Sequence, residues 1–201
     1  MAIAQERLPL IEDFLASLEQ FIFNRERQHE QAARLATGIF AALKNFKPSE
    51  PAPPQRFSIC DRMDEAIQAI PCDKQDSQAL GRSLRALDRF IPWYQRAASL
   101  DDEPEFKLGH ANAMLIGPKG IESREDVWIG VSLMAPHVTY PNHHHPPEEI
   151  YAVLSPGQWR QGDGPWSEPG IGGIVYNPPN IVHAMRSRDR CLLAVWALMA
   201  A

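Results

Sequence analysis

The sequence predicts a mainly β protein with a helical N-terminal part, in which an α-helical region precedes a small β-barrel of the jelly-roll or sandwich kind. Three observations predict it: apolar residues recur at helical spacing in the first half, short strand-like runs fill the second half, and the pattern changes near Asp101. Closing short strands into a barrel removes exposed sheet edges. We therefore expect residues 1–100 to form the helical region, packed on the barrel, and residues 101–201 to form the barrel itself.

The first half contains four helical patterns. Residues 10–22 and 33–43 carry apolar side chains every three or four positions, which is typical of two amphipathic helices. Four prolines between residues 47 and 55 break the second helix and form a stiff connection. A short helix over residues 61–70 and a longer one over residues 78–97, kinked or ended at its proline, complete the region.

The second half consists of short runs rich in β-branched and aromatic residues, which favour strands. The clearest are residues 113–116, 127–134, 150–154, 174–176 and 192–198. Segments rich in glycine and proline at residues 117–120 and 161–165 predict turns between them.

Composition limits the classes of function. A chain of 201 residues with 44% hydrophobic residues can build one ordinary core, and a net charge of -5 predicts no binding of nucleic acid or anionic membrane. Cys60, Cys72 and Cys191 are scattered and lack Cys-x-x-Cys spacing, which is typical of reduced thiols in the cytoplasm. No stretch is long enough to cross a bilayer, and the N-terminus lacks the pattern of an export signal. We expect a cytoplasmic protein, with a homodimer as an open alternative to a monomer.

The segment from His143 to Tyr151, H-H-H-P-P-E-E-I-Y, predicts a metal site. On a strand, His143 and His145 would point the same way, as would Glu149 and Tyr151. With the distant His183, they offer two or three imidazoles and one carboxylate. That set suits zinc, iron, manganese or nickel and leaves positions open for a substrate. We therefore predict one divalent transition metal ion in a site of the catalytic type.

Two motifs around these residues resemble those of the cupin family. They are His143-x-His145-x3-Glu149 with Gly157, and Gly172-x5-Pro178-x-Asn180-x2-His183. Gly157 lies one residue later than in the usual pattern, and Asn180 stands where glycine is common. Asparagine tolerates a left-handed backbone better than most residues do, so the turn before His183 can survive the exchange. The resemblance implies a cupin barrel, that is, a double-stranded β-helix or jelly roll.

Within the cupins, three sequence segments resemble those of the dimethylsulfoniopropionate (DMSP) lyases, and the resemblance is closest to the DddQ type. They are Trp128-Ile-Gly130, Tyr140-Pro through Leu154, and His183-Ala-Met185-Arg186. The resemblance is strong in the C-terminal half, whereas the helical half agrees in arrangement but carries no motif. It implies a metal-dependent carbon-sulfur lyase of the dimethylpropiothetin dethiomethylase type, which cleaves DMSP to dimethyl sulfide and acrylate by β-elimination.

The same resemblance implies roles for individual residues. His145, Glu149 and His183 would be metal ligands, Tyr151 a ligand that doubles as the base, and Tyr140 and His143 neighbours that shape the substrate site. A tyrosine has an unperturbed pKa near 10 and is a poor base at neutral pH, so contact with the metal has to lower that pKa. A role for His143 as a fourth ligand stays open.

Aromatic rings are candidates for the sulfonium end of the substrate, because their faces attract soft cations by about 0.5 to 2 kcal/mol. The candidates are Trp128, Trp166, Tyr176 and Trp196, with ordinary core packing as the alternative for each. Arg186 either steers the carboxylate or forms a surface salt bridge. His29, His110 and His137 lack ligand spacing and are expected to be structural or solvated.

Two other functions fit the same ligands. A cupin dioxygenase acting on a small organic acid would use ferrous iron and consume oxygen, and a non-catalytic cupin would bind a small acid without turnover. In all three cases the expected partner is a small molecule. Release of dimethyl sulfide without oxygen separates the lyase from both alternatives.

Overall fold

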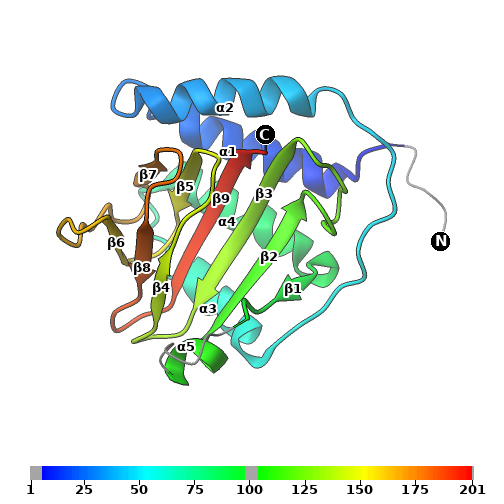
Figure 1. The fold of residues 1–201 in the computed structure, drawn as a ribbon. Coiled ribbons are helices and arrows are strands. Elements are labelled where there is room, and N and C mark those ends of the chain that lie inside the picture. Colours follow the sequence, from blue (N-terminus) through cyan, green and yellow to red (C-terminus); the bar gives the residue numbers. More distant parts are fainter. Residues whose placement is uncertain (1–5, 98–103, 201) are drawn as a thin grey trace.

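The computed structural model describes residues 6–97 and 104–200 and contains helices followed by strands, as predicted (Figure 1). The helices are α1 (Pro9–Phe23), α2 (Glu30–Leu43), α3 (Met63–Gln68), α4 (Gln75–Leu87) and α5 (Pro104–Gly109), with 3-10 helices η1 (Ser58–Arg62) and η2 (Asp88–Phe90). The strands are β1 (Trp93–Tyr94), β2 (His110–Ile116), β3 (Val127–Met134), β4 (Thr139–His143), β5 (Glu149–Val153), β6 (Gln158–Gln161), β7 (Ile174–Asn177), β8 (His183–Arg186) and β9 (Leu192–Met199). The predicted boundary between residues 100 and 101 lies outside the described residues.

Two antiparallel sheets form the barrel. The large sheet has the strand order β1-β2-β3-β9-β5-β7, and the small sheet has the order β4-β8-β6. In Figure 1 the small sheet lies beside the end of the large sheet that carries β5 and β7, the helices α1 to α4 lie along the outer face of the large sheet, and α5 lies at one end of the barrel. Helices therefore cover one face of the large sheet, and the other face is left for the site.

The apolar core is divided in the same way. One buried cluster joins the helices to alternate residues of the large sheet, such as Leu193, Val195 and Ala197 of β9. The residues between them on β9, Leu192, Ala194 and Trp196, belong to a second cluster inside the barrel. Because side chains alternate along a strand, burial on both faces explains why β9 is an almost unbroken apolar run.

A buried group of ion pairs and hydrogen bonds connects the C-terminal end of α2 to the segment between β2 and β3. Arg124 donates hydrogen bonds from Nη2 to the carbonyl of Ala42 (3.0 Å) and from Nη1 to that of Asn45 (2.9 Å). Its Nη1 lies 3.4 Å from Glu122 Oε1, and Arg7 Nε lies 2.7 Å from Glu122 Oε2. The side chains of Arg124 and Glu122 are only 1% and 4% exposed. The arginines thus satisfy helix carbonyls and the buried carboxylate together.

The predicted helix over residues 78–97 has the wrong bounds, although the expectation that it is kinked or ended at its proline is confirmed. Helix α4 begins at Gln75, and the helical turns end at Phe90, where Ile91 is extended (φ -71°, ψ 121°). A proline disfavours the helical conformation of the residue before it, and Ile91 directly precedes Pro92. The two residues after the proline form the edge strand β1, paired with β2.

The three strands of the small sheet are not among the strands that the sequence predicts. Each has only four or five residues, and β4 contains a proline. His143 ends β4, with a register shift between Tyr140 and His143, and His145 lies in the loop that follows. The expectation that His143 and His145 share one strand is therefore wrong, although both reach the same cavity.

Candidate functional site

Strand alternation places two candidate residues of β5 inside the barrel. Ile150 and Ala152 belong to the cluster under the helices, whereas Tyr151 belongs to the interior cluster and Glu149 has the same parity. Both side chains are almost fully buried, at 4% exposure for Glu149 and 3% for Tyr151. Glu149 and Tyr151 therefore share one strand face, as the sequence predicts, and both line the same cavity.

The small sheet and its loops bring three histidines to this face. His143 and His183 are paired in register across β4 and β8, with ring centroids 4.0 Å apart. Asn180 adopts the left-handed conformation expected of it (φ 59°), and its N–H donates to the carbonyl of His145 (3.0 Å). That backbone bond joins the two motif segments and holds His145 opposite His183, with ring centroids 5.2 Å apart.

Three side chains meet at one point. The ligand atoms of His145, Glu149 and His183 all lie within 4.8 Å of one another. The Nε2 atoms of His145 and His183 each lie 3.3 Å from Glu149 Oε2, and both nitrogens are buried without a hydrogen-bond partner. Their Nδ1 atoms lie 2.9 Å from backbone carbonyls, those of Pro147 and Ile181.

This arrangement passes a chemical test for a metal site. A carbonyl next to Nδ1 requires the proton on that nitrogen, which leaves the Nε2 lone pair of each imidazole directed at the carboxylate oxygen. Two lone pairs and a carboxylate that converge without hydrogens between them suit a divalent cation. His145, Glu149 and His183 could therefore hold a first-row transition metal.

His143 lies beside this group and outside it. Its Nδ1 lies 2.9 Å from the carbonyl of Pro141, and its ring is 4.8 Å from that of Tyr140. Burial, and then the neighbouring His183, lowers the pKa of His143 to about 4. At neutral pH it is a neutral imidazole on the cavity wall. His144, by contrast, is exposed.

Burial and neighbouring side chains shift the pKa values of Glu149 and Tyr151 in opposite directions. Burial alone would raise the pKa of Glu149, but the neighbouring imidazoles of His145 and His183 outweigh burial and lower that pKa to about 2. Burial, followed by the charge of Glu149, raises the pKa of Tyr151 well above 10. Glu149 is therefore ionised at neutral pH, and the Tyr151 phenol keeps its proton unless a cation is nearby.

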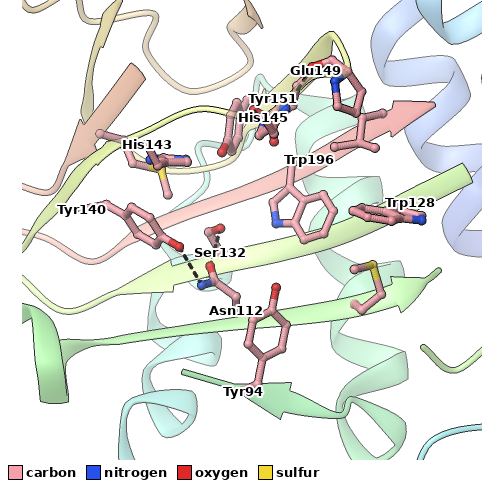
Figure 2. A pocket seen from close by; sticks show the side chains of 14 residues that line it. Tyr94, Asn112, Trp128, Ser132, Tyr140, His143, His145, Glu149, Tyr151 and Trp196 are labelled. Carbon is pink, nitrogen blue, oxygen red and sulfur yellow. Dashed lines mark hydrogen bonds and ion pairs between the residues drawn. The ribbon is translucent and has the colours of Figure 1, made fainter. Parts of the chain in front are cut away.

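The site opens into a cavity of about 190 Å³. Its lining comprises Tyr94, Asn112, Met114, Trp128, Ser132, Tyr140, His143, His145, Pro147, Glu149, Tyr151, Met185, Trp196 and Leu198. Pockets for drug-sized ligands span roughly 300 to 1,000 Å³, so this cavity suits a smaller molecule. Figure 2 shows polar side chains on one side of it and the indoles of Trp128 and Trp196 on another, with the hydroxyl of Tyr94 pointing toward them.

A glycine makes room for one of these indoles. Gly130 on β3 is directly opposite Trp196 on β9. A Cβ atom at residue 130 would lie 2.1 Å from Cζ2 of Trp196, well inside the 3.0 Å that real contacts respect. The absence of a side chain at Gly130 lets the Trp196 ring lie against the sheet and form part of the cavity wall.

A chain of hydrogen bonds crosses the cavity floor. Ser132 Oγ donates to Asn112 Oδ1 (2.7 Å), and Asn112 Nδ2 donates to the hydroxyl of Tyr140 (3.2 Å; Figure 2). Both residues are buried, at 3% exposure for Ser132 and 4% for Asn112. Asn112, Ser132, Tyr94 and Met114 were not predicted as site residues, because single residues on separate strands leave no spacing signal in the sequence.

Some predicted residues lie elsewhere. The Tyr176 hydroxyl donates to Glu148, and Trp166 stacks with Arg186, whose guanidinium carbon is 4.2 Å from the ring centroid, so neither aromatic residue lines the cavity. Arg186 Nε donates to Gln158 Oε1 (2.6 Å). Within the described residues, Arg186 thus contacts a neutral amide and an indole, which fits neither of its two expected roles.

The remaining histidines and cysteines lie away from the proposed ligands. His110 is buried and stacked on Phe106, whereas the His137 side chain is 72% exposed. Burial, followed by the charge of Arg25, lowers the pKa of His29. All three cysteines are free thiols, with Cys72 exposed and the other two buried. Within the described residues, no helix is both long and apolar enough to cross a membrane.

Comparison with known proteins gives one family. The model of the DMSP lyase family matches residues 26–194 of the chain. A Cereibacter sphaeroides protein described as a candidate DMSP lyase, DddL, is 32% identical over 87 residues, which are 42% of this chain and 37% of that protein. The chain therefore matches little more than a third of this curated relative's length.

Two solved structures share the fold. A structure described among the DMSP lyases RdDddP and RnDddQII aligns over 96% of this chain and 93% of its own, with a TM-score of 0.70 and 18% identity. The DMSP lyase DddQ of Ruegeria pomeroyi DSS-3 aligns over 94% and 92%, with a TM-score of 0.69 and 23% identity. With the observed sheet topology, these matches confirm the predicted fold, a cupin barrel behind a helical region.

Proposed function

Because the chain belongs to the DMSP lyase family, we propose that it is a metal-dependent carbon-sulfur lyase that cleaves DMSP to dimethyl sulfide and acrylate. One observation carries the proposal. Three convergent ligand atoms adjoin a small cavity with an aromatic wall, and two of the ligands, His145 and Glu149, line that cavity together with the buried phenol of Tyr151. Such a cavity has a place for the carboxylate of a substrate, a side chain that can act as its base, and an aromatic wall for a soft cation.

We assign the metal to His145, Glu149 and His183. Their hydrogen-bonded Nδ1 atoms fix the two imidazoles, and the Glu149 carboxylate is itself held by Asn177, whose Nδ2 donates to Glu149 Oε2 (2.9 Å). Such secondary hydrogen bonds orient ligands before a metal arrives. A bound divalent cation would act as a Lewis acid for the substrate carboxylate and would lower the pKa of a nearby phenol.

The two ends of the substrate differ in chemistry, and so do the two sides of the cavity. The carboxylate belongs on the polar side with His143 and Tyr140, next to the proposed ligands. The dimethylsulfonium belongs against Trp128 and Trp196, since aromatic faces attract such a cation by about 0.5 to 2 kcal/mol. Tyr94, which lines the same cavity, adds a third aromatic ring.

Tyr151 is the proposed base. Its phenolate would take the proton from the carbon next to the carboxylate, and the electron pair of that C–H bond would form the carbon-carbon double bond. The carbon-sulfur bond then breaks with its pair going to sulfur, which leaves as neutral dimethyl sulfide. A neutral leaving group needs no separate general acid. Burial of the phenol keeps water away from it and leaves the substrate as the available proton source.

Headspace detection of dimethyl sulfide tests this function. Purified protein loaded in turn with zinc, iron, manganese or nickel should release the gas from DMSP, equally well with and without oxygen. Treatment with a chelator should abolish the release, and the same metal should restore it. Oxygen consumption coupled to turnover would indicate a dioxygenase instead. No release with any of the four metals would refute the lyase proposal.

A further inference from the structure

The polar pair Asn112 and Ser132 is unusual for its surroundings. The two residues are directly opposite each other on β2 and β3, and both side chains point into the barrel interior. Their neighbours around the cavity include Met114, Trp128 and Trp196, which are apolar or aromatic. Burying an amide and a hydroxyl there costs free energy unless both are hydrogen-bonded. Each is bonded, and the chain of bonds ends at Tyr140.

The hydrogen bonds run in one direction. Ser132 donates to the carbonyl oxygen of the Asn112 amide, so the amide presents its N–H to Tyr140. The phenol oxygen of Tyr140 accepts that hydrogen bond, and its own O–H hydrogen must find another acceptor. Within residues 6–97 and 104–200, no side chain or carbonyl accepts a hydrogen bond from it. The hydroxyl lies at the cavity, which Tyr140 lines (Figure 2).

The surroundings keep Tyr140 in place as a neutral donor. Its ring packs edge-on against Phe106, with centroids 5.0 Å apart, and the Arg96 guanidinium carbon lies 5.5 Å from its centroid. Burial raises the pKa of the phenol, although hydrogen bonding by Asn112 and the charge of Arg96 oppose the rise. At neutral pH Tyr140 therefore retains the proton that it would donate.

We propose that Ser132 and Asn112 are positioning residues that hold the Tyr140 hydroxyl as a hydrogen-bond donor to the anionic group of the bound ligand. This inference rests on the proposed function only in taking that ligand to be a small carboxylate. Without Ser132, the Asn112 amide loses the partner that fixes its orientation. The amide can then rotate and accept the hydrogen of Tyr140, and the cavity loses its donor.

A double-mutant cycle with propionate as the probe tests the proposal. Propionate is a small carboxylate that has no leaving group, so its dissociation constant reports binding alone. Tyr140→Phe, Asn112→Leu and Ser132→Ala should each weaken binding by about 10- to 100-fold, the range for a hydrogen bond to a charged group. In a Tyr140→Phe background, Asn112→Leu or Ser132→Ala should cause little further loss.

Ser155→Ala is the matched control. Ser155 is buried to the same degree as Ser132, at 2% exposure, and its Oγ accepts a hydrogen bond from the backbone N–H of Leu193, but it does not line the cavity. It should lower the melting temperature without changing the affinity for propionate. If Ser132→Ala acted only by loosening the barrel, Ser155→Ala and Ser132→Ala would weaken propionate binding to a similar extent.

Two results would overturn the inference. One is wild-type propionate affinity in both Ser132→Ala and Asn112→Leu. The other is that Ser132→Ala and Asn112→Leu weaken propionate binding equally with and without the Tyr140 hydroxyl, which would mean that Ser132 and Asn112 do not act through Tyr140. DMSP turnover by the wild type is measured separately. If no dimethyl sulfide forms while the cycle gives the expected coupling, the lyase proposal fails and the carboxylate donor stands.

Discussion

Substituting Gly130 by alanine should damage both the barrel and the substrate cavity. The added methyl would lie 2.1 Å from Cζ2 of Trp196 and 2.2 Å from the carbonyl oxygen of Ala113. The indole can turn aside, but the carbonyl belongs to the backbone of β2, so the strand itself has to move. Because β2 and β3 are paired along almost their whole length, that movement strains several ladder hydrogen bonds.

The expected size follows from these two contacts. Overpacking of this kind costs about 1 to 3 kcal/mol, which lowers the melting temperature of a chain of this length by roughly 2 to 12 °C. An indole pushed out of place loses its attraction for the sulfonium, which is about 0.5 to 2 kcal/mol and corresponds to a roughly 2- to 30-fold rise in KM for DMSP.

Differential scanning calorimetry and headspace kinetics measure the two effects. Gly38→Ala is the matched control, because Gly38 lies within α2 and its added methyl meets only the flexible sulfur end of Met199, at 2.9 Å. There the better helix propensity of alanine should stabilise the protein by up to about 1 kcal/mol. A Gly130→Ala protein that melts and binds DMSP like the wild type would refute the reasoning about the close approach of Trp196.

Three further predictions concern stability and metal binding. Arg124→Leu leaves Glu122 with one fewer cation in a buried setting and frees the carbonyls of Ala42 in α2 and of Asn45 after it, so unfolding should become easier by about 3 to 5 kcal/mol in a denaturant titration; a loss under about 1 kcal/mol would contradict this. The Arg124 guanidinium lowers the pKa of Asp126 from 3.8 to about 2, so folding favours the ionised form: its stabilisation is complete above about pH 4 and is lost as the pH falls toward 2. Asp126→Asn should therefore show a smaller acid loss of stability than the wild type, and identical acid profiles would exclude this contribution. Zinc should raise the melting temperature of chelator-treated protein but not of His183→Ala, whereas exposed His144→Ala should respond like the wild type; an equal response of all three would place the metal elsewhere.

The fold could be predicted where periodicity is strong. The apolar spacing of α1 and α2 and the β-branched run of β3 indicate these elements within a few residues of their observed bounds. The short strands β4, β6 and β8 carry polar residues and, in β4, a proline, so their conformation depends on pairing with one another rather than on local preference. The expectation that Pro92 kinks or ends the long helix is confirmed, because the residue before a proline, here Ile91, is held out of the helical conformation.

Some residues of the candidate site could be predicted from the sequence, and others could not. His145, Glu149 and His183 stand out because ligand residues at fixed spacing within two motifs are visible in a sequence, and the structure brings them together. Asn112 and Ser132 meet only through the register of β2 with β3, and nothing in either segment alone indicates that partnership. Trp128 and Trp196 line the cavity, whereas Tyr176 does not, and its hydroxyl donates to Glu148 instead.

Loss of the Tyr151 hydroxyl is the most direct test of the proposed chemistry. Tyr151→Phe should slow dimethyl sulfide release from DMSP by about 10²- to 10⁴-fold, the usual contribution of a proton-transfer group, while metal content and propionate affinity stay within a few-fold of the wild type. Tyr176→Phe, which removes a hydroxyl outside the cavity, should release dimethyl sulfide at close to the wild-type rate. If the Tyr151→Phe protein, with its metal bound, releases the gas as fast as the wild type does, Tyr151 is not the base.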